Sequence, residues 1–262
     1  MSRLWHFKMD GQAEDRKSGA VGIIMSLFFL IALAYASAGF GGGSSYTAVL
    51  LLRGEEQDVV RAVSLVCNLV VAGVGGWMSL RAQRVRGKLL GPLLLSSIPA
   101  VWLGTLIQME GRTFEIVLGC ALFVAGILLL MQQKKVAETR KVRAPVLVIF
   151  GILLGLLAGV TGIGGGIYLV PALHLLKAGA PKEIAAVGTW FIIVNSIVGL
   201  GSVVISQGTL SIADYRWLPL AVACGGLLGA KLLQGVFHET WIRQMTGVLV
   251  LAVAVRVILV LG

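Results

Sequence analysis

The stretches AGFGGGSSYTAVLLLRG (38–54) and VTGIGGGIYLVPALHLLKAG (160–179) each place three consecutive glycines inside a long apolar segment. The two glycine triplets lie 123 residues apart, and the basic residues that follow them, Arg53 and Lys177, lie 124 apart. This matched spacing predicts a tandem duplication. Paired glycine-interrupted apolar segments at corresponding positions of two halves are typical of the substrate site of a secondary transporter.

The composition predicts an all-α polytopic membrane protein. The 262 residues are 57% hydrophobic and only 13% charged, and their mean hydropathy is +0.93. A helix needs about 20 apolar residues to cross the hydrocarbon core. Eight segments have that character: 20–52, 59–80, 89–108, 114–131, 145–176, 184–206, 216–236 and 241–261.

These segments predict two tandem repeats of about four transmembrane segments each, in which glycines break the first segment of each repeat. A polar tail (1–18) precedes the first repeat (19–133), and a basic linker (134–143) joins it to the second (144–262).

Two loops carry much of the net charge of +10. Their basic residues are Arg81, Arg84, Arg86 and Lys88 in the first loop, and Lys134, Lys135, Arg140, Lys141 and Arg143 in the second. Cytoplasmic loops of membrane proteins are enriched in Lys and Arg, so both loops are expected in the cytoplasm. Orientation in the membrane accounts for these basic residues, so no nucleic-acid partner is expected.

The broken segments are too long for one straight span. Residues 20–52 would extend roughly 50 Å as a continuous helix, against a hydrocarbon core of about 30 Å. We favour one bent crossing for each broken segment, which places both termini in the cytoplasm. The alternative is a hairpin at each glycine triplet; it gives five passes per half, inverted repeats and an N-terminus outside.

A helix that begins inside the membrane offers unpaired N–H groups and the positive end of its dipole, which together favour an anion. Ser44 and Ser45 suit the N-cap of such a helix. The candidate substrate-binding residues are Gly41, Gly42, Gly43, Ser44, Ser45, Gly164, Gly165, Gly166 and Ile167, with side-chain donors from Asn68, Thr189 and Asn195. Ser196 is expected to bond to its own helix. Alternatively, the glycines only allow close helix crossing.

Several stretches resemble the TauE/SafE sulfite-exporter family of bacterial membrane carriers. They are GVTGIGGGIYLVPAL (159–173), AAVGTWFIIVNSIVGLG (185–201), SSIPAVWLGT (96–105) and GGLLGAKL (225–232). The first repeat departs from the family pattern, because GGGSSYTAVL stands where an aliphatic run with a proline is usual. The resemblance implies export or uptake of a small oxyanion such as sulfite, thiosulfate or a short organosulfonate like sulfoacetate, across the cytoplasmic (inner) membrane of a bacterium. We expect export, by alternating access around the two glycine-broken helices.

Other function classes find less support. The three cysteines, Cys67, Cys120 and Cys224, are isolated in apolar stretches, so neither a metal site nor a cofactor is expected. Motifs of hydrolases, P-loop enzymes and metalloproteases are missing, so an enzyme is not expected. A passive anion channel and a carrier of a small carboxylate remain alternatives. The expected partners are a small anion and the lipid bilayer, and a homodimer is left open.

Overall fold

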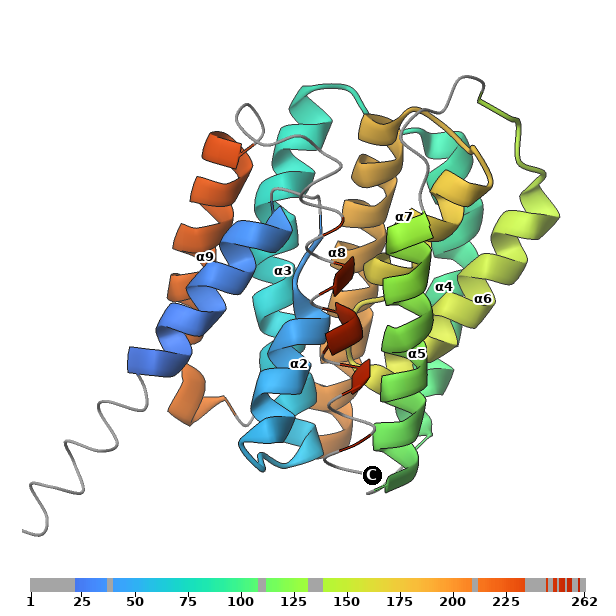
Figure 1. Ribbon diagram of the computed structural model, residues 1–262. Coiled ribbons are helices and arrows are strands. Elements are labelled where there is room, and N and C mark those ends of the chain that lie inside the picture. The colour runs from blue at the N-terminus through green and yellow to red at the C-terminus, as the bar shows by residue number, and fades with distance from the viewer. Residues whose placement is uncertain are drawn as a thin grey trace, which may run out of the picture.

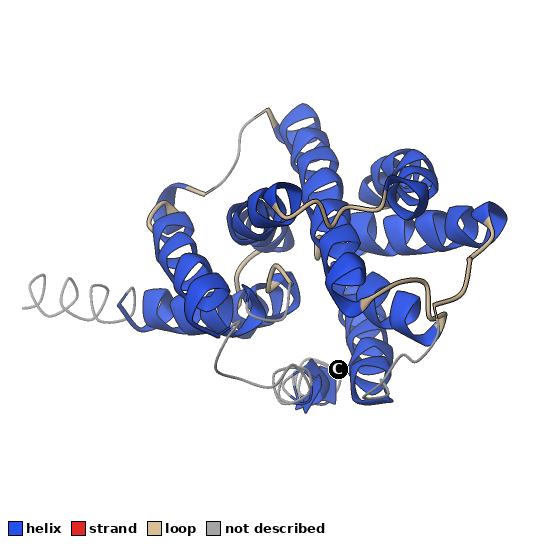
Figure 2. Cartoon of the chain, turned by 90° about the horizontal axis from the view of Figure 1, so that it is seen from above, coloured by secondary structure: helices blue, strands red, loops and turns tan. Residues whose placement is uncertain are grey.

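The computed structural model describes residues 22–36, 40–107, 112–131, 139–208 and 212–233, together with scattered positions between 244 and 259. Figure 2 shows helices and loops but no strand in this part of the chain. The helices are Gly22–Ala36, α2 (Gly43–Leu52), α3 (Gln57–Arg81), α4 (Gly87–Leu106), α5 (Arg112–Met131), α6 (Ala144–Thr161), α7 (Gly166–Leu175), α8 (Pro181–Gln207) and α9 (Leu218–Leu228), with short turns η1 (Ala213–Tyr215) and η2 (Gly229–Leu233).

Four helices, α3, α4, α6 and α8, are long and apolar enough to cross a membrane. The predicted all-helical multi-pass character is thus confirmed for the described residues. The polar tail 1–18 lies outside the described residues, as do residues 134–138 of the linker 134–143 and much of the segment 241–261.

The second broken segment folds back on itself at its glycines. The backbone N–H of Arg140, before α6, donates to the carbonyl of Lys177, after α7, at 2.8 Å. In one straight helix these residues would be about 55 Å apart. The single crossing favoured from the sequence is therefore wrong here, because the chain reverses at this break as the hairpin alternative expected.

The first broken segment folds back as well. The ring of Phe28, in helix 22–36, stacks on that of Tyr46, in α2, with centroids 4.6 Å apart. A continuous helix would separate them by about 27 Å. Figure 1 shows helix 22–36 in blue and α2 in lighter blue running in opposite directions. Length alone required a break, and the side-chain contacts show that the chain reverses at it.

Helices α3 and α8 pack against each other at the centre of the molecule, and α4 packs against both α8 and α6 (Figure 1). Glycines on α6 allow this close crossing. A Cβ at Gly155 would lie 2.9 Å from the Cα of Ser97, and one at Gly159 would lie 2.3 Å from the carbonyl oxygen of Val101. Small residues at such crossings let helix backbones approach closely in membranes.

The opposite side of the molecule has a similar crossing. A Cβ at Gly225 would lie 2.3 Å from the carbonyl oxygen of Phe29, and one at Gly229 would lie 2.3 Å from that of Leu33. Helix 22–36 therefore packs against α9, which follows α8 in the chain. Helices from the two halves of the sequence therefore pack against each other on both sides of the molecule: α4 against α6 on one side, and helix 22–36 against α9 on the other.

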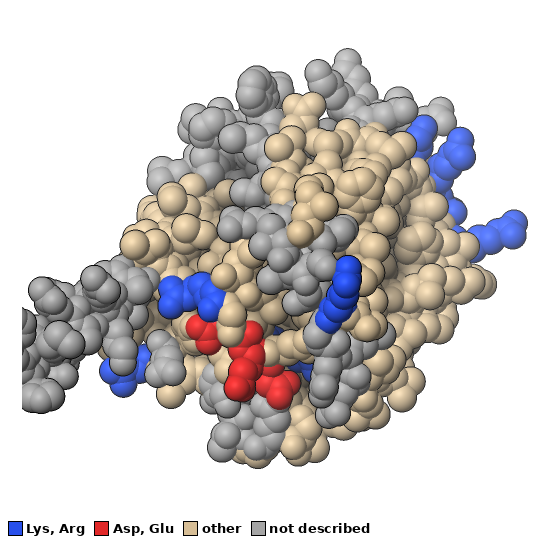
Figure 3. Space-filling model, turned by 60° about the horizontal axis from the view of Figure 1, so that its bottom comes forward, with Lys and Arg blue, Asp and Glu red and all other residues tan. Residues whose placement is uncertain are grey.

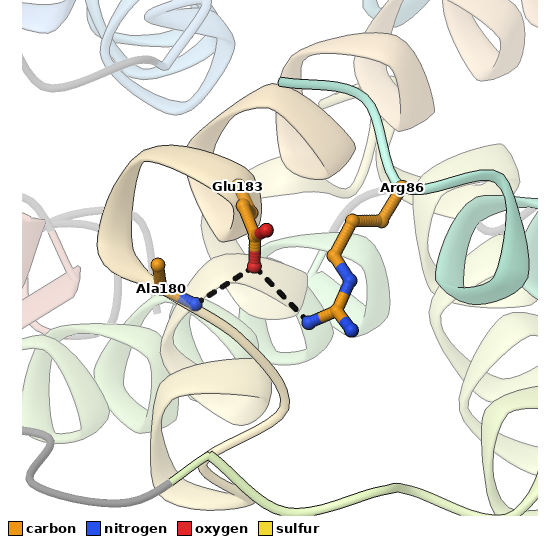
Figure 4. A network of polar contacts seen from close by, with 3 residues as sticks. All are labelled: Arg86, Ala180 and Glu183. Atoms are coloured by element: carbon orange, nitrogen blue, oxygen red, sulfur yellow. Dashed lines mark hydrogen bonds and ion pairs between the residues drawn. The ribbon is translucent and has the colours of Figure 1, made fainter. Parts of the chain in front are cut away.

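The two basic loops lie at the same end of the molecule. Arg86 Nη1, before α4, lies 3.1 Å from Glu183 Oε2 in the first turn of α8, and the same oxygen accepts a hydrogen bond from the N–H of Ala180 (Figure 4). Arg140 bonds to Lys177 in the same α7–α8 connection. The shared side predicted for the two loops agrees with these contacts.

The opposite end carries the loop between α2 and α3. This loop and the first turn of α3 carry Glu55, Glu56 and Asp58. Figure 3, which brings the bottom of the molecule forward, shows acidic side chains gathered there. The Tyr215 hydroxyl, in the loop between α8 and α9, donates to Glu55 Oε1. One carboxylate lies near the start of each central helix: Glu55 precedes α3, and Glu183 lies in the first turn of α8. Each contacts the loop that follows the other central helix, Glu55 through Tyr215 and Glu183 through Arg86.

Candidate functional site

Each hairpin turns at a glycine that begins a new helix. Gly42 is the N-cap of α2 with φ of 86°, and Gly165 is the N-cap of α7 with φ of 77°. Only glycine adopts this left-handed conformation without strain. In both turns the amide four residues on, that of Tyr46 or Leu169, donates to the N-cap carbonyl.

The N-cap predicted for α2 was wrong by two residues. Ser44 and Ser45 lie in the first turn of α2. The N-cap is Gly42, so α2 begins without a capping hydrogen bond from a side chain. The hydroxyl of Ser45 lies 2.8 Å from that of Tyr35, and Ser44 Oγ lies 3.4 Å from the same hydroxyl. These serines therefore tie α2 to helix 22–36 across the hairpin.

Helix geometry leaves the first N–H groups of α2 and α7 without partners inside their own helices. In α2 these groups belong to Gly43 and Ser44, and in α7 to Gly166 and Ile167. All four residues are buried. Both helices therefore begin in the protein interior, where dipole ends act more strongly than at a surface.

Asn68, on α3, lies between the two breaks. A Cβ at Gly43 would lie 2.2 Å from Asn68 Nδ2, and one at Gly41 would lie 2.3 Å from Asn68 Oδ1. Across the interface, Asn68 Nδ2 donates to the carbonyl of Ile163 at 2.8 Å. The prediction that the two glycine runs lie close together agrees with these contacts, which join residues 95 positions apart.

Ile192, on α8, makes the reciprocal contacts. A Cβ at Gly166 would lie 2.3 Å from Ile192 Cδ1, and one at Gly41 would lie 3.4 Å from its Cγ2. Asn68 of α3 therefore contacts both breaks, and Ile192 of α8 contacts both breaks from the opposite side. The arrangement is similar on the two sides, but one side presents an amide and the other a hydrocarbon chain.

Ser196 joins this centre, which the sequence did not predict. A Cβ at Gly164 would lie 3.0 Å from Ser196 Oγ and 3.2 Å from Asn68 Nδ2. Ser196 is fully buried, and its hydroxyl has no hydrogen-bond partner. Its spacing of four residues from Ile192, one helical turn, is the sequence signal that would have placed it on the same face of α8.

Two predicted donors lie elsewhere. Asn195 faces α4, where its Oδ1 accepts a hydrogen bond from Ser97 Oγ at 2.9 Å. The hydroxyl of Thr189 donates to Ala185 in its own helix, and its methyl group would lie 3.4 Å from a Cβ at Gly75. The structure therefore groups Asn68 with the breaks and places Thr189 and Asn195 at helix contacts.

Arg61 is a half-buried cation beside the second break. Its guanidinium donates to the carbonyl of Val160 at 3.0 Å, at the carboxyl end of α6, and its side chain packs on Gly162. A positive charge at a helix carboxyl end stabilises the helix. Arg61 therefore supports the position of the hairpin that carries Gly164.

The site consists of two helix amino ends, one amide and one hydroxyl, all buried. Such neutral, oriented donors hold an anion without a full opposing charge, which suits binding followed by release. Among the described residues, no group of three or more His, Cys, Asp or Glu could hold a metal ion.

Comparisons with known proteins identify the family of the chain. The family described as "Sulfite exporter TauE/SafE" matches residues 24–257. A relative from Sinorhizobium fredii (strain NBRC 101917 / NGR234), named "Probable membrane transporter protein y4hK", is 29% identical over 244 residues, which cover 91% of this chain and 98% of the relative. No solved structure matches. Family and relative indicate a membrane transporter, and the chain belongs to the TauE/SafE sulfite exporter family.

Proposed function

We propose that this protein is a secondary transporter that moves a small oxyanion across the bacterial cytoplasmic membrane. The substrate class comprises sulfite, thiosulfate and short organosulfonates such as sulfoacetate. The proposal rests on one observation: the amino ends of α2 and α7 begin at breaks that meet on either side of Asn68. Two converging dipole ends attract an anion, and the contacts with both hairpins tie the site to both halves of the chain.

The substrate would be held by the N–H groups of Gly43, Ser44, Gly166 and Ile167, with Asn68 and Ser196 beside it. These backbone groups are fixed in the folded protein, so they need no reorganisation when the anion arrives. A Cβ at Gly41 or Gly164 would lie within 3.2 Å of the Asn68 amide, so the absence of side chains at these glycines lets this amide pack directly against both breaks.

We further propose that the halves 19–133 and 144–262 are inverted repeats that exchange the site between the two membrane faces. Three sets of contacts support this. Asn68 and Ile192 make reciprocal contacts at the breaks. Helix α4 crosses α6 as α9 crosses helix 22–36. Near the start of α8, Glu183 contacts Arg86 in the loop after α3, and before the start of α3, Glu55 contacts Tyr215 in the loop after α8.

Charge at the two ends supports export. The end with Arg86 and Arg140 carries the basic loops, which we assign to the cytoplasm by their Lys and Arg content. With this orientation and a hairpin at the first break, Gly22 lies outside. Basic residues around the cytoplasmic mouth raise the local concentration of anions there. The acidic group formed by Glu55, Glu56 and Asp58 at the other mouth favours release.

Counterflow in proteoliposomes tests the proposed function. Vesicles preloaded with unlabelled sulfite should accumulate labelled sulfite transiently, and saturably, only when they contain the protein. A linear, non-saturable flux without counterflow would identify a channel instead. Competition by acetate stronger than that by sulfite or sulfoacetate would identify a carboxylate carrier.

A further inference from the structure

The amide of Asn68 has a fixed orientation with one oxygen unpaired. Its Nδ2 donates to the carbonyl of Ile163 at 2.8 Å, and because a carbonyl can only accept, this contact determines which end of the amide is nitrogen. Asn68 Oδ1 is then the free end. It is buried, since Asn68 is 1% exposed, and it has no hydrogen-bond partner.

This unpaired oxygen points into the centre described above. A Cβ at Gly41 would lie 2.3 Å from Oδ1, and one at Gly43 would lie 2.9 Å from it. Buried polar atoms in folded proteins nearly always have a partner. An acceptor left unpaired beside the amino end of α2 therefore indicates a ligand that brings its own hydrogen.

A fully ionised oxyanion cannot supply that hydrogen. The sulfite dianion and thiosulfate present only acceptor oxygens, which would face the lone pairs of Asn68 Oδ1. The N–H groups of Gly43 and Gly166 still favour a negative charge. A ligand that satisfies both requirements is an anion at one end and a hydrogen donor at another.

From this we infer that the preferred substrate is a monoanion that carries a hydrogen-bond donor, of which hydrogensulfite is the simplest example, and that Asn68 Oδ1 accepts its hydrogen. This inference rests on the proposed function. It makes Asn68 the residue that distinguishes the protonated from the ionised form. Ser196 Oγ can both donate and accept, so it serves either form equally.

The opposite side of the site offers no amide acceptor that corresponds to Asn68. Ile192 makes the reciprocal contacts to those of Asn68, and its aliphatic chain offers no acceptor. The proton therefore travels on the substrate, and no carboxylate at the site is needed to carry it.

The test is a pH series of binding to the full chain in detergent by isothermal titration calorimetry, with sulfite and methanesulfonate as probes. Methanesulfonate is a monoanion at every pH used and has no hydrogen-bond donor on its sulfonate. Above the pH at which hydrogensulfite ionises, the affinity for total sulfite should fall about tenfold per pH unit. Methanesulfonate should bind more weakly than hydrogensulfite and without this pH dependence.

Two variants assign the effect to one residue. Asn68→Leu, of similar size, should lose the preference for the protonated form, so that sulfite affinity no longer falls with pH. Ser196→Ala should weaken both probes by the same factor, about tenfold, and keep the pH dependence.

A wild-type affinity for sulfite that is constant or rises as the pH increases would overturn the inference, even if Asn68→Leu does not fold. Binding of neither probe at any pH, together with no counterflow, would instead reject the proposed function. The two failures are therefore distinguishable.

Discussion

Arg86, directly before α4, and Glu183, in the first turn of α8, form an ion pair of 3.1 Å although they are 97 residues apart in the chain. Their side chains are 45% and 33% exposed. An exposed pair of this kind contributes at most about 1 kcal/mol to stability. Its position matters more than its strength, because it joins the start of α4 to the start of α8 at the end of the molecule that carries the basic loops.

If these helix ends separate during transport, a covalent link there will stop it. The double variant Arg86→Cys/Glu183→Cys, in a background with the three native cysteines replaced, should lose sulfite counterflow on oxidation and regain it on reduction. Each single cysteine variant should keep counterflow under both conditions. Full counterflow by the oxidised, cross-linked protein would show that this end does not open.

Gly41→Ala should impair transport through one contact. The new Cβ would lie 2.3 Å from Asn68 Oδ1, and Gly41 has no positive φ that would add backbone strain. Asn68 would have to move from Ile163, and the initial rate of counterflow should fall at least about tenfold, a loss comparable to that of one hydrogen bond to a charged ligand. Gly73→Ala, on α3 with nothing within 4 Å, is the matched control. Equal loss in both variants would show that the loss in Gly41→Ala does not come from its contact with Asn68.

Substitutions at Asn68 and Asn195 should have different effects, the first mainly on substrate binding and the second mainly on helix packing. Asn68→Leu should weaken sulfite binding by about tenfold or more below the pH at which hydrogensulfite ionises, because it removes the amide beside both breaks. Asn195→Leu removes the hydrogen bond with Ser97 between α4 and α8, so it should lower the unfolding temperature and weaken sulfite binding less. Calorimetric binding and thermal unfolding of both variants measure this. A larger affinity loss in Asn195→Leu would move the site toward α4.

Gly159→Ala should destabilise the protein. A Cβ there would lie 2.3 Å from the carbonyl oxygen of Val101 and 2.9 Å from the Cα of Gly104. Overpacking against a backbone costs about 1–3 kcal/mol, because neither helix can yield without losing contacts. Thermal unfolding followed by tryptophan fluorescence should show a lower transition temperature. Gly91→Ala, on α4 in open space, should leave it unchanged, and an unshifted Gly159→Ala would mean that α4 and α6 are farther apart.

The sequence by itself determined the helical segments, the two breaks and the common side of the basic loops. These features are local: apolar length defines a spanning helix, glycine interrupts one, and Lys and Arg avoid the hydrocarbon core. Asn68 could also be selected from sequence, because a polar side chain inside an apolar helix is rare without a function.

Only the tertiary structure decided the direction of the chain after each break and the residues that meet there. Positive φ angles at Gly42 and Gly165 depend on the packing of whole hairpins, which no local pattern specifies. The free oxygen of Asn68 follows from a bond to Ile163, 95 residues away. Ser196 and Asn195 are adjacent in sequence, yet successive residues of a helix point in directions about 100° apart, so they face different neighbours. Packing between helices that are distant in the sequence therefore places Ser196 at the centre and Asn195 against α4.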